Sequence, residues 1–282
     1  MTIKNGFWRR FCRNKGAVIG LAVLVIAALV AILGPWLAPN DPWDMVERPF
    51  LSPMGGPGML LGTDTLGRDI LSGVIHGTRV SLLIGLISTV VSLLIGVSLG
   101  AMSGYFGGWI DAALMRFTEL FQAIPSFALA IVLVAVFEPS LGSIIAAISL
   151  VSWPPVARLV RGEFLTLRQR DFVAAALLAG QSTPRIILTQ ILPNAISPII
   201  VMGSLMIASA ILLESSLSFL GLGDPNAMSW GYMVGSARTV LLQAWWMAVF
   251  PGLAIVLTVL AFNLVGEGLN DGLNARADGR TK

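Results

Sequence analysis

The sequence offers few residues whose types and spacing could support covalent chemistry. It holds one histidine, His76, and one cysteine, Cys12, which the charge pattern described below places on opposite sides of a membrane. One imidazole without other ligands makes a poor metal site, and one thiol cannot form an intrachain disulfide. None of the three lysines follows a glycine, so the phosphate-binding pattern G-x-x-x-x-G-K-[ST] is missing. We therefore expect no catalytic, metal or cofactor site in this chain.

Two polar side chains, Glu214 and Asn263, stand in long apolar stretches instead. An ionisable group that faces lipid costs on the order of 3 kcal/mol, so Glu214 is expected to face other helices or a water-filled path. Three interpretations stay open for Glu214: it lines or gates a transport pathway, it packs against a polar neighbour, or it lies close to the membrane interface. Asn263 has the same alternatives.

The composition is typical of a membrane protein. Hydrophobic residues make up 56% of the 282 residues and charged residues 12%, and the mean hydropathy is +0.84, which excludes an ordinary soluble domain. A helix needs roughly 20 apolar residues to cross the hydrocarbon core. Six uncharged windows are long enough for one helix each: 16–40, 80–110, 120–137, 139–157, 186–213 and 239–266. We therefore predict an all-α integral membrane protein with about six transmembrane helices.

The basic residues predict an orientation, because Lys and Arg accumulate on cytoplasmic loops. With the N-terminus inside, fourteen of the 18 Lys and Arg residues fall on the cytoplasmic side. The four outside are Arg48, Arg68, Arg79 and Arg238. Both termini are therefore expected in the cytoplasm. The basic residues lie beside the spans and form no surface stripe, so the net charge of +3 does not indicate nucleic-acid binding.

The spans and loops divide the chain into parts. The first apolar run exceeds the roughly 7 to 15 residues usual for a secretory signal, so we expect it to stay as an anchor. The segment after it is rich in proline and glycine and should form an external loop. The predicted parts are a cytoplasmic N-terminus at 1–16, an anchor at 17–37, the external loop at 38–79, a five-span core at 80–266 with a cytoplasmic loop at 161–194, and a cytoplasmic tail at 267–282.

Three glycines in the second span indicate a close helix contact. Gly96, Gly100 and Gly104 recur every four residues and place bare backbone on one helix face. Another helix can approach that face closely.

Prolines predict where the later spans bend or end. Pro125 should kink the third span. We expect the fourth span to end at Pro154 and Pro155, and the fifth to start near Pro198.

The cytoplasmic loop at 161–194 is much longer than a connection requires. A first short helix should be capped by Asp171 and ended by Gly180. A second should start at Ser182 and Pro184 and stop before Pro193. The sequence thus predicts two short helices with a bend between them.

This loop resembles the "EAA" loop of permeases from ABC importers. The residues that carry the resemblance are Ala174, Ala175, Ala176, Gly180, Leu192 and Pro193. In that family the loop couples the membrane helices to a cytoplasmic ATPase, whose groove receives the short helix. The chain departs from the pattern at Ala174, where the family has Glu, and at Gln190, where it has an apolar residue. Asp171 is expected to supply the acidic contact instead.

Further motifs resemble the branch of this family that serves dipeptides, oligopeptides and nickel. These motifs are Gly62-Thr63-Asp64 with Gly67-Arg68-Asp69, Ser218-Phe219-Leu220-Gly221-Leu222-Gly223 with Ser229-Trp230-Gly231, Pro251-Gly252-Leu253-Ala254-Ile255 with Ala261-Phe262-Asn263-Leu264, and the entry Arg13-Asn14-Lys15-Gly16. The resemblance implies the type I importer permease fold, called MetI-like, with an extra N-terminal span.

The resemblance also implies a place and a set of partners. The chain would lie in a bacterial inner membrane among lipid, with loop 38–79 in the periplasm. It would pair with a second, homologous permease subunit, two cytoplasmic ATPase subunits that hold ATP and Mg, and a periplasmic solute-binding protein. The expected function is peptide import by alternating access, without an ATPase site of its own. A nickel or glutathione importer, a self-contained secondary transporter and a membrane scaffold stay open as alternatives.

Overall fold

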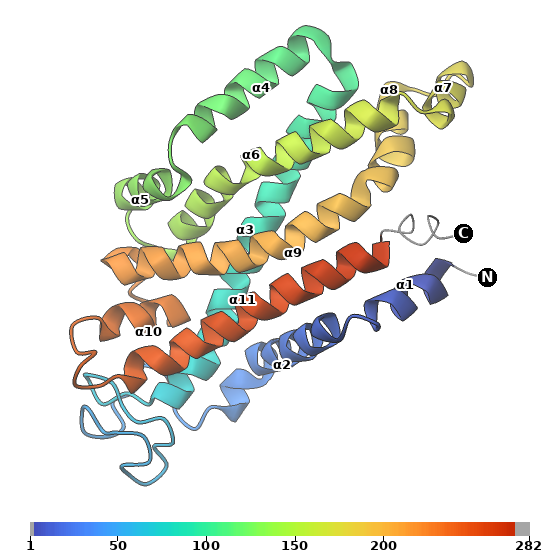
Figure 1. Ribbon diagram of the computed structural model, residues 1–282. Coiled ribbons are helices and arrows are strands. Elements are labelled where there is room, and N and C mark those ends of the chain that lie inside the picture. Colours follow the sequence, from blue (N-terminus) through green and yellow to red (C-terminus); the bar gives the residue numbers. More distant parts are fainter. Residues whose placement is uncertain (1–2, 274–282) are drawn as a thin grey trace.

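The computed structural model describes residues 3–273, and most of them are helical. The last part of the expected tail, 274–282, lies outside the described residues. Figure 1 shows long helices that run across the molecule, with α7 at one end and the loop 38–69 at the other. We call these the α7 end and the loop end. The helix α1 and the end of α11 also lie at the α7 end (Figure 1).

The elements follow one another with the bounds α1 Ile3–Phe11, α2 Lys15–Leu37, α3 Ile70–Phe106, α4 Gly108–Ala123, α5 Ser126–Phe137, α6 Leu141–Arg168, α7 Asp171–Leu178, α8 Thr183–Arg185, the π-helical turn η1 Ile186–Ile191, α9 Leu192–Leu217, the π-helical turn η2 Ser218–Leu222, α10 Trp230–Ala237 and α11 Trp246–Leu273. The helix α3 has its most extensive contacts with α6, and α11 packs on α2 and α9.

Five helical stretches are long and apolar enough to cross a membrane. They are Lys15–Gly34, Ile70–Phe106, Leu141–Arg168, Thr183–Leu222 and Trp246–Leu273. The pair α4 and α5 makes a sixth candidate, bent by 81°. The prediction of an all-helical membrane protein with about six spans is confirmed.

The third span differs from the expected kinked helix over 120–137. Its first half, α4, already begins at Gly108, and the chain breaks fully between α4 and α5. Ile124 adopts an extended conformation with φ −96° and ψ 131° because the ring of Pro125 disfavours a helical residue before it. Pro125 also lacks the N–H that would continue α4.

The expected end of the fourth span at Pro154 and Pro155 is wrong. The helix α6 runs through both prolines to Arg168. A proline inside a helix costs about 3 kcal/mol. That cost is offset by tertiary packing, since Val156 and Val160 on the following turns are completely buried.

The second helix of the cytoplasmic loop also differs from the prediction, because it does not stop before Pro193. Helical structure continues from Thr183 to Leu222, so the fifth span does not start near Pro198. The π-helical turn η1 precedes Pro193, and the N–H of Leu192 bonds to the carbonyl of Ile187 five residues back. This wider turn leads into α9, with Pro193 in its first turn, where a missing N–H is tolerated.

The second span begins earlier than its uncharged window. Asp69 caps α3, since its carboxylate accepts hydrogen bonds from the N–H groups of Leu71 at 3.2 Å and Ser72 at 3.0 Å. His76 therefore lies inside α3 and not in the preceding loop. The loop itself is held to α11, because the indole N–H of Trp246 donates to the carbonyl of Thr63 at 3.0 Å.

The three glycines of the second span lie directly against α6. A Cβ added at Gly96 would come within 2.5 Å of the Val156 Cβ, and one at Gly104 within 2.6 Å of the Phe164 Cβ. At Gly100 it would collide with the Ala157 carbonyl. The two backbones therefore approach so closely that no side chain fits between them.

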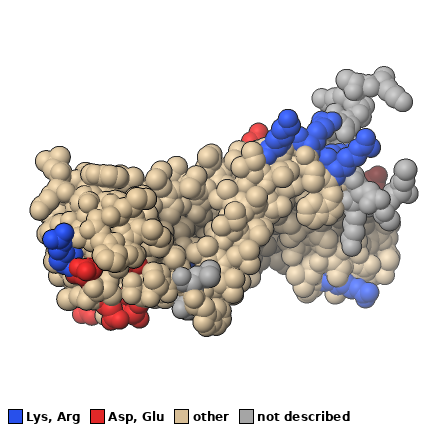
Figure 2. Space-filling model, turned by 90° about the horizontal axis from the view of Figure 1, so that it is seen from below, with Lys and Arg blue, Asp and Glu red and all other residues tan. Residues whose placement is uncertain are grey.

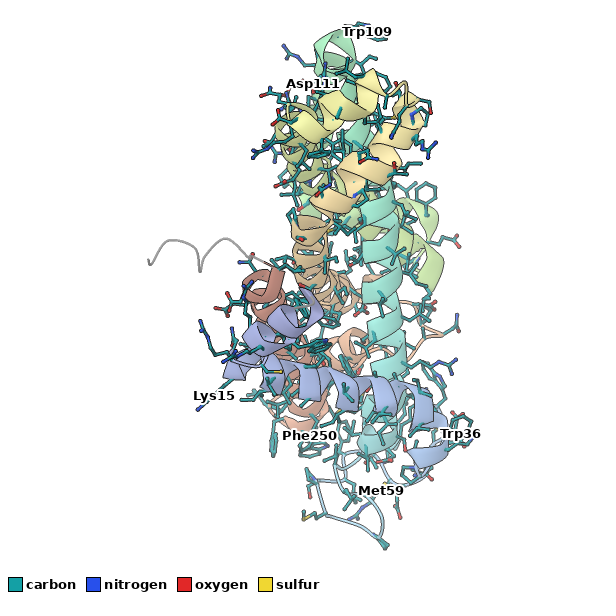
Figure 3. The ribbon with its side chains drawn as sticks, turned by 90° about the vertical axis from the view of Figure 1, so that its right-hand side faces the viewer. Lys15, Trp36, Met59, Trp109, Asp111 and Phe250 are labelled. Carbon is teal, nitrogen blue, oxygen red and sulfur yellow. The ribbon has the colours of Figure 1, made fainter. Side chains whose placement is uncertain are left out.

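Charged residues divide between the two ends of the molecule. Figure 2 shows Lys and Arg gathered mainly at the α7 end of the face in view, and Asp and Glu mainly at the loop end. In Figure 3, Trp109 and Asp111 of α4 lie at one edge of the molecule and Met59 of the loop lies at the opposite edge.

Replacing Gly100 by leucine is expected to destabilise the α3–α6 contact. The added side chain would meet Ala157 and Val160, and overpacking of this kind costs about 1–3 kcal/mol. Thermal unfolding of the purified protein in detergent should show a lower melting temperature for Gly100→Leu. Gly162→Leu is the matched control, because a side chain at Gly162 on α6 would enter open space. Equal melting temperatures for the two variants would contradict the close contact.

Candidate functional site

The short helix α7 stands outside the bundle (Figure 1). Its outer face is apolar, since Phe172, Leu177 and Leu178 are exposed. Its inner face is anchored by Val173 and Ala176, which are buried and belong to the same core cluster as Ile186 and Ile191 of η1. On the outer face Leu178 is 90% exposed. An exposed apolar patch on an anchored helix, here Phe172, Leu177 and Leu178, indicates a surface that a partner covers.

The end of α7 has the geometry expected for Gly180. This residue has φ +72°, which a glycine adopts without strain. The Gly180 N–H donates to the Leu177 carbonyl at 3.0 Å, and the Gln181 N–H donates to the Ala176 carbonyl at 3.1 Å. These two bonds form a Schellman motif, which gives α7 a defined end.

The expected capping role of Asp171 is not what the structure shows. The capping position is Arg170, whose side chain makes no capping hydrogen bond. Asp171 is the first residue of α7 and its side chain is exposed. A carboxylate there still interacts favourably with the helix N-terminus.

The predicted coupling residues form two groups in space. Ala174 and Ala175 are exposed on α7, whereas Ala176 faces inward. Leu192 and Pro193 lie at the junction of η1 and α9. Gln190, at the same junction, donates from its side-chain amide to the Gln181 side chain at 3.5 Å, a long hydrogen bond between the junction and the turn after α7.

A polar cleft opens beside α7, between the end of α6, the start of α9 and the end of α11. Its lining includes Glu163, Arg170, Asn194, Ser197 and Asn270. Both hydrogen-bond donors and acceptors are present, so the cleft can hold water or a polar solute. Sequence reasoning missed this cleft because it joins residues from three distant segments.

Glu214 is buried among hydroxyl groups near the end of α9. It is 1% exposed, and its carboxylate accepts hydrogen bonds from the hydroxyl groups of Ser218 at 2.8 Å and Ser229 at 2.7 Å. The Ser229 hydroxyl also accepts from the Tyr232 N–H at 3.0 Å and so caps α10. A Cβ at Gly231 would lie 2.9 Å from both carboxylate oxygens. The carboxylate thus joins α9 to the start of α10.

Asn263 has a different setting from Glu214. It is exposed on α11, on a helix face that also leaves the side chains of Val256 and Leu260 exposed. A polar side chain on the open face of a span is costly in lipid, which indicates that another helix or water covers it.

An ion pair between α4 and α6 was not anticipated from the sequence. The Arg161 Nε and a terminal guanidinium nitrogen lie 2.6 Å from Asp111 Oδ1 and Oδ2, respectively. The Ser103 hydroxyl at the end of α3 donates to the same carboxylate. Asp111 follows directly after the uncharged window 80–110, which was the one available signal.

No group of three His, Cys, Asp or Glu side chains that could hold a metal ion occurs within residues 3–273.

Two family comparisons match the chain. The family described as "Binding-protein-dependent transport system inner membrane component" matches residues 96–279. The family described as "N-terminal TM domain of oligopeptide transport permease C" matches residues 5–53.

Three curated relatives cover nearly the whole chain. The di/tripeptide transport system permease protein DppC of Pseudomonas aeruginosa is 43% identical, over 96% of this chain and 91% of the relative. The dipeptide transport system permease protein DppC of Escherichia coli K12 is 44% identical, over 98% and 94%. The glutathione transport system permease protein GsiD of Pectobacterium atrosepticum is 41% identical, over 96% and 90%.

Solved structures share the fold. An inward-facing structure of the MetNI methionine ABC transporter matches with a TM-score of 0.59 at 16% identity, over 70% of this chain and 94% of that chain. At such low identity the likeness concerns the fold alone. The sequence matches go further: the chain belongs to the family of binding-protein-dependent transport system inner membrane components.

Proposed function

We propose that this chain is the permease subunit of an ATP-driven importer for dipeptides, oligopeptides or a similar small solute. The main support for the proposal is the helix α7, which protrudes from the bundle. Its residues Val173 and Ala176 are buried and anchor it, whereas Leu178 is exposed. In a family that works with binding proteins, such a helix is suited to a groove on an ATPase. The peptide class rests on the peptide-permease names of relatives at 43% and 44% identity.

The partners follow from the same argument. Two ATPase subunits would hold ATP and Mg and receive α7, while this chain contributes no nucleotide site of its own. One chain has one α7, so a second, homologous permease would present the other docking helix. A periplasmic solute-binding protein would deliver the solute to the loop end.

The α7 end would lie in the cytoplasm. The gathering of Lys and Arg at that end (Figure 2) is the distribution that the positive-inside rule requires. Both termini would then be cytoplasmic, and loop 38–69 would face the periplasm of a bacterial inner membrane. The polar cleft beside α7 would open toward the cytoplasm and serve as part of the exit path.

The transport pathway would run along α9 and α11, facing the second permease. Asn263 on the exposed face of α11 is suited to line it, whereas the enclosed Glu214 is better suited to holding α10 in place near the outer side. In alternating access, the pathway would be closed at the loop end while the cleft beside α7 is open. It would be open at the loop end while that cleft is closed.

A glutathione importer is the second candidate for the cargo. The relative from Pectobacterium atrosepticum, a glutathione permease by name, is 41% identical over 96% of this chain. Glutathione is itself a small peptide, so the two candidates share one chemical class.

Uptake by the reconstituted complex tests the proposed function. The chain is co-expressed with a second permease, ATPase subunits and a binding protein from the same organism, and the complex is placed in lipid vesicles. A labelled dipeptide should enter only with ATP and the binding protein, and labelled glutathione serves as the competing cargo. Uptake by the chain alone, driven by an ion gradient, would overturn the proposal.

Leu178→Asp is expected to weaken binding of the ATPase subunits. Losing one buried leucine from an interface costs about 2 kcal/mol, or roughly 30-fold in affinity. Copurification of the ATPase subunits and peptide-stimulated ATP hydrolysis are the measurements. Leu242→Asp is the matched control, because Leu242 is fully exposed between α10 and α11, at the loop end. If both variants retained the ATPase subunits equally, the docking role of α7 would be wrong.

Glu214→Ala is expected to loosen α10. The hydroxyl groups of Ser218 and Ser229 would lose their acceptor, and an unsatisfied buried polar group costs about 1–3 kcal/mol. The variant should melt at a lower temperature and show faster hydrogen–deuterium exchange in α10. Ser216→Ala, at an exposed serine of the same helix, should change neither. Unchanged melting and exchange together with lost uptake would instead assign Glu214 to the pathway.

A further inference from the structure

The helix α4 lies between a flexible glycine joint and a proline break. At its start, Gly107 and Gly108 have φ +67° and +54°, and a side chain at Gly108 would meet open space. At its end, the break at Ile124 and Pro125 turns the chain by 81°. The glycine joint leaves the angle of α4 free, so contacts along the helix must set it.

Few contacts along α4 are available for this purpose. Thr118 is the one fully buried residue of the helix. Midway, Phe117 and Phe121 pack on Trp153 of α6, with ring centroids 5.9 Å and 5.3 Å apart. Near the first joint, the contact is the ion pair between Asp111 and Arg161.

The geometry of the ion pair fixes both the distance between α4 and α6 and their relative orientation at this point. Two parallel bonds of 2.6 Å join the planar guanidinium of Arg161 to both carboxylate oxygens of Asp111. The Asp111 side chain is 17% exposed and that of Arg161 35% exposed, so water competes for the pair only in part. Because Ser103 of α3 donates to the same carboxylate, three helices meet there.

Arg161 also lies on the part of α6 that carries α7. Only Gln169 and Arg170 separate the end of α6 from the start of α7. A displacement of α7 therefore reaches Arg161 through a two-residue turn and the last two turns of α6.

We propose that Asp111 and Arg161 are positioning residues that make α4 follow the movement of α6 and α7, so that ATPase closure is passed to the bent pair α4–α5. The inference rests on the proposed function, in which α7 docks on the ATPase. Without the pair, α7 and α6 would still move, but α4 would turn freely at its two glycines. ATP would then be hydrolysed with less solute moved.

The test compares variants of the full complex in lipid vesicles by the number of solute molecules transported per ATP hydrolysed. Asp111→Asn should keep assembly and basal ATP hydrolysis and lower this ratio about tenfold. The double variant Asp111→Arg with Arg161→Asp should restore much of the ratio. Glu119→Gln is the matched control, because it breaks the exposed pair of Arg116 and Glu119 on the same helix, at 4.0 Å.

A second variant and a second measurement keep the test decisive. If Asp111→Asn lowers the yield of complex, Arg161→Lys retains the charge without the two parallel bonds and should give an intermediate ratio. Hydrogen–deuterium exchange of α4 should rise in both variants, whether or not solute is transported.

The inference would be overturned if Asp111→Asn and Glu119→Gln gave the same ratio of solute transported to ATP hydrolysed. It would also be overturned if uptake and ATP hydrolysis fell in parallel and the reversed pair restored neither. Failure of the proposed function would look different. In that case the unaltered complex would show no ATP-driven uptake, while exchange in α4 would still report whether the pair holds the helix.

Discussion

The close contact between α3 and α6 is the constraint on which the rest of the structure depends. Three glycines at four-residue spacing let the two backbones meet, and Val156, Val160 and Phe164 fill the space beside them. This burial keeps α6 helical through two adjacent prolines. Because α6 stays continuous, it can carry α7 on its far end.

Three local devices extend this rigid pair to the surrounding elements. The Schellman motif at Gly180 gives α7 a fixed end, so that its outer face has a defined shape. The carboxylate of Asp111 attaches α4 to α3 and α6, and the carboxylate of Glu214 attaches α10 to α9. Both side chains meet several hydrogen-bond donors, since a polar group with little access to water is costly without partners. The polar groups of this apolar protein therefore act mainly as connections between helices.

The sequence could predict what depends on local pattern and not what depends on distant partners. Uncharged windows and glycine spacing are visible along the chain, and they anticipated the spans and the glycine-lined face of α3. The sequence did not predict that α6 continues through Pro154 and Pro155. The free-energy cost of a proline in a helix can be inferred from the sequence, whereas the burial against α3 that offsets this cost depends on tertiary structure. Asp111 and Arg161 are fifty residues apart, and nothing in the sequence pairs them. For Glu214 the sequence indicated that the side chain faces away from lipid, but it did not indicate that Ser229 would be its hydrogen-bond partner.

Because their backbones meet without intervening side chains, we expect α3 and α6 to move as one body when ATP acts on α7. Pulsed electron paramagnetic resonance tests it directly, because replacing Cys12 leaves a chain free of cysteine in which Ser98 on α3 and Gly162 on α6, both exposed, can carry spin labels. In the assembled complex, we expect one narrow distance between the two labels that is the same without nucleotide and with ATP bound. A shift of several ångströms or a second distance on ATP binding would contradict it.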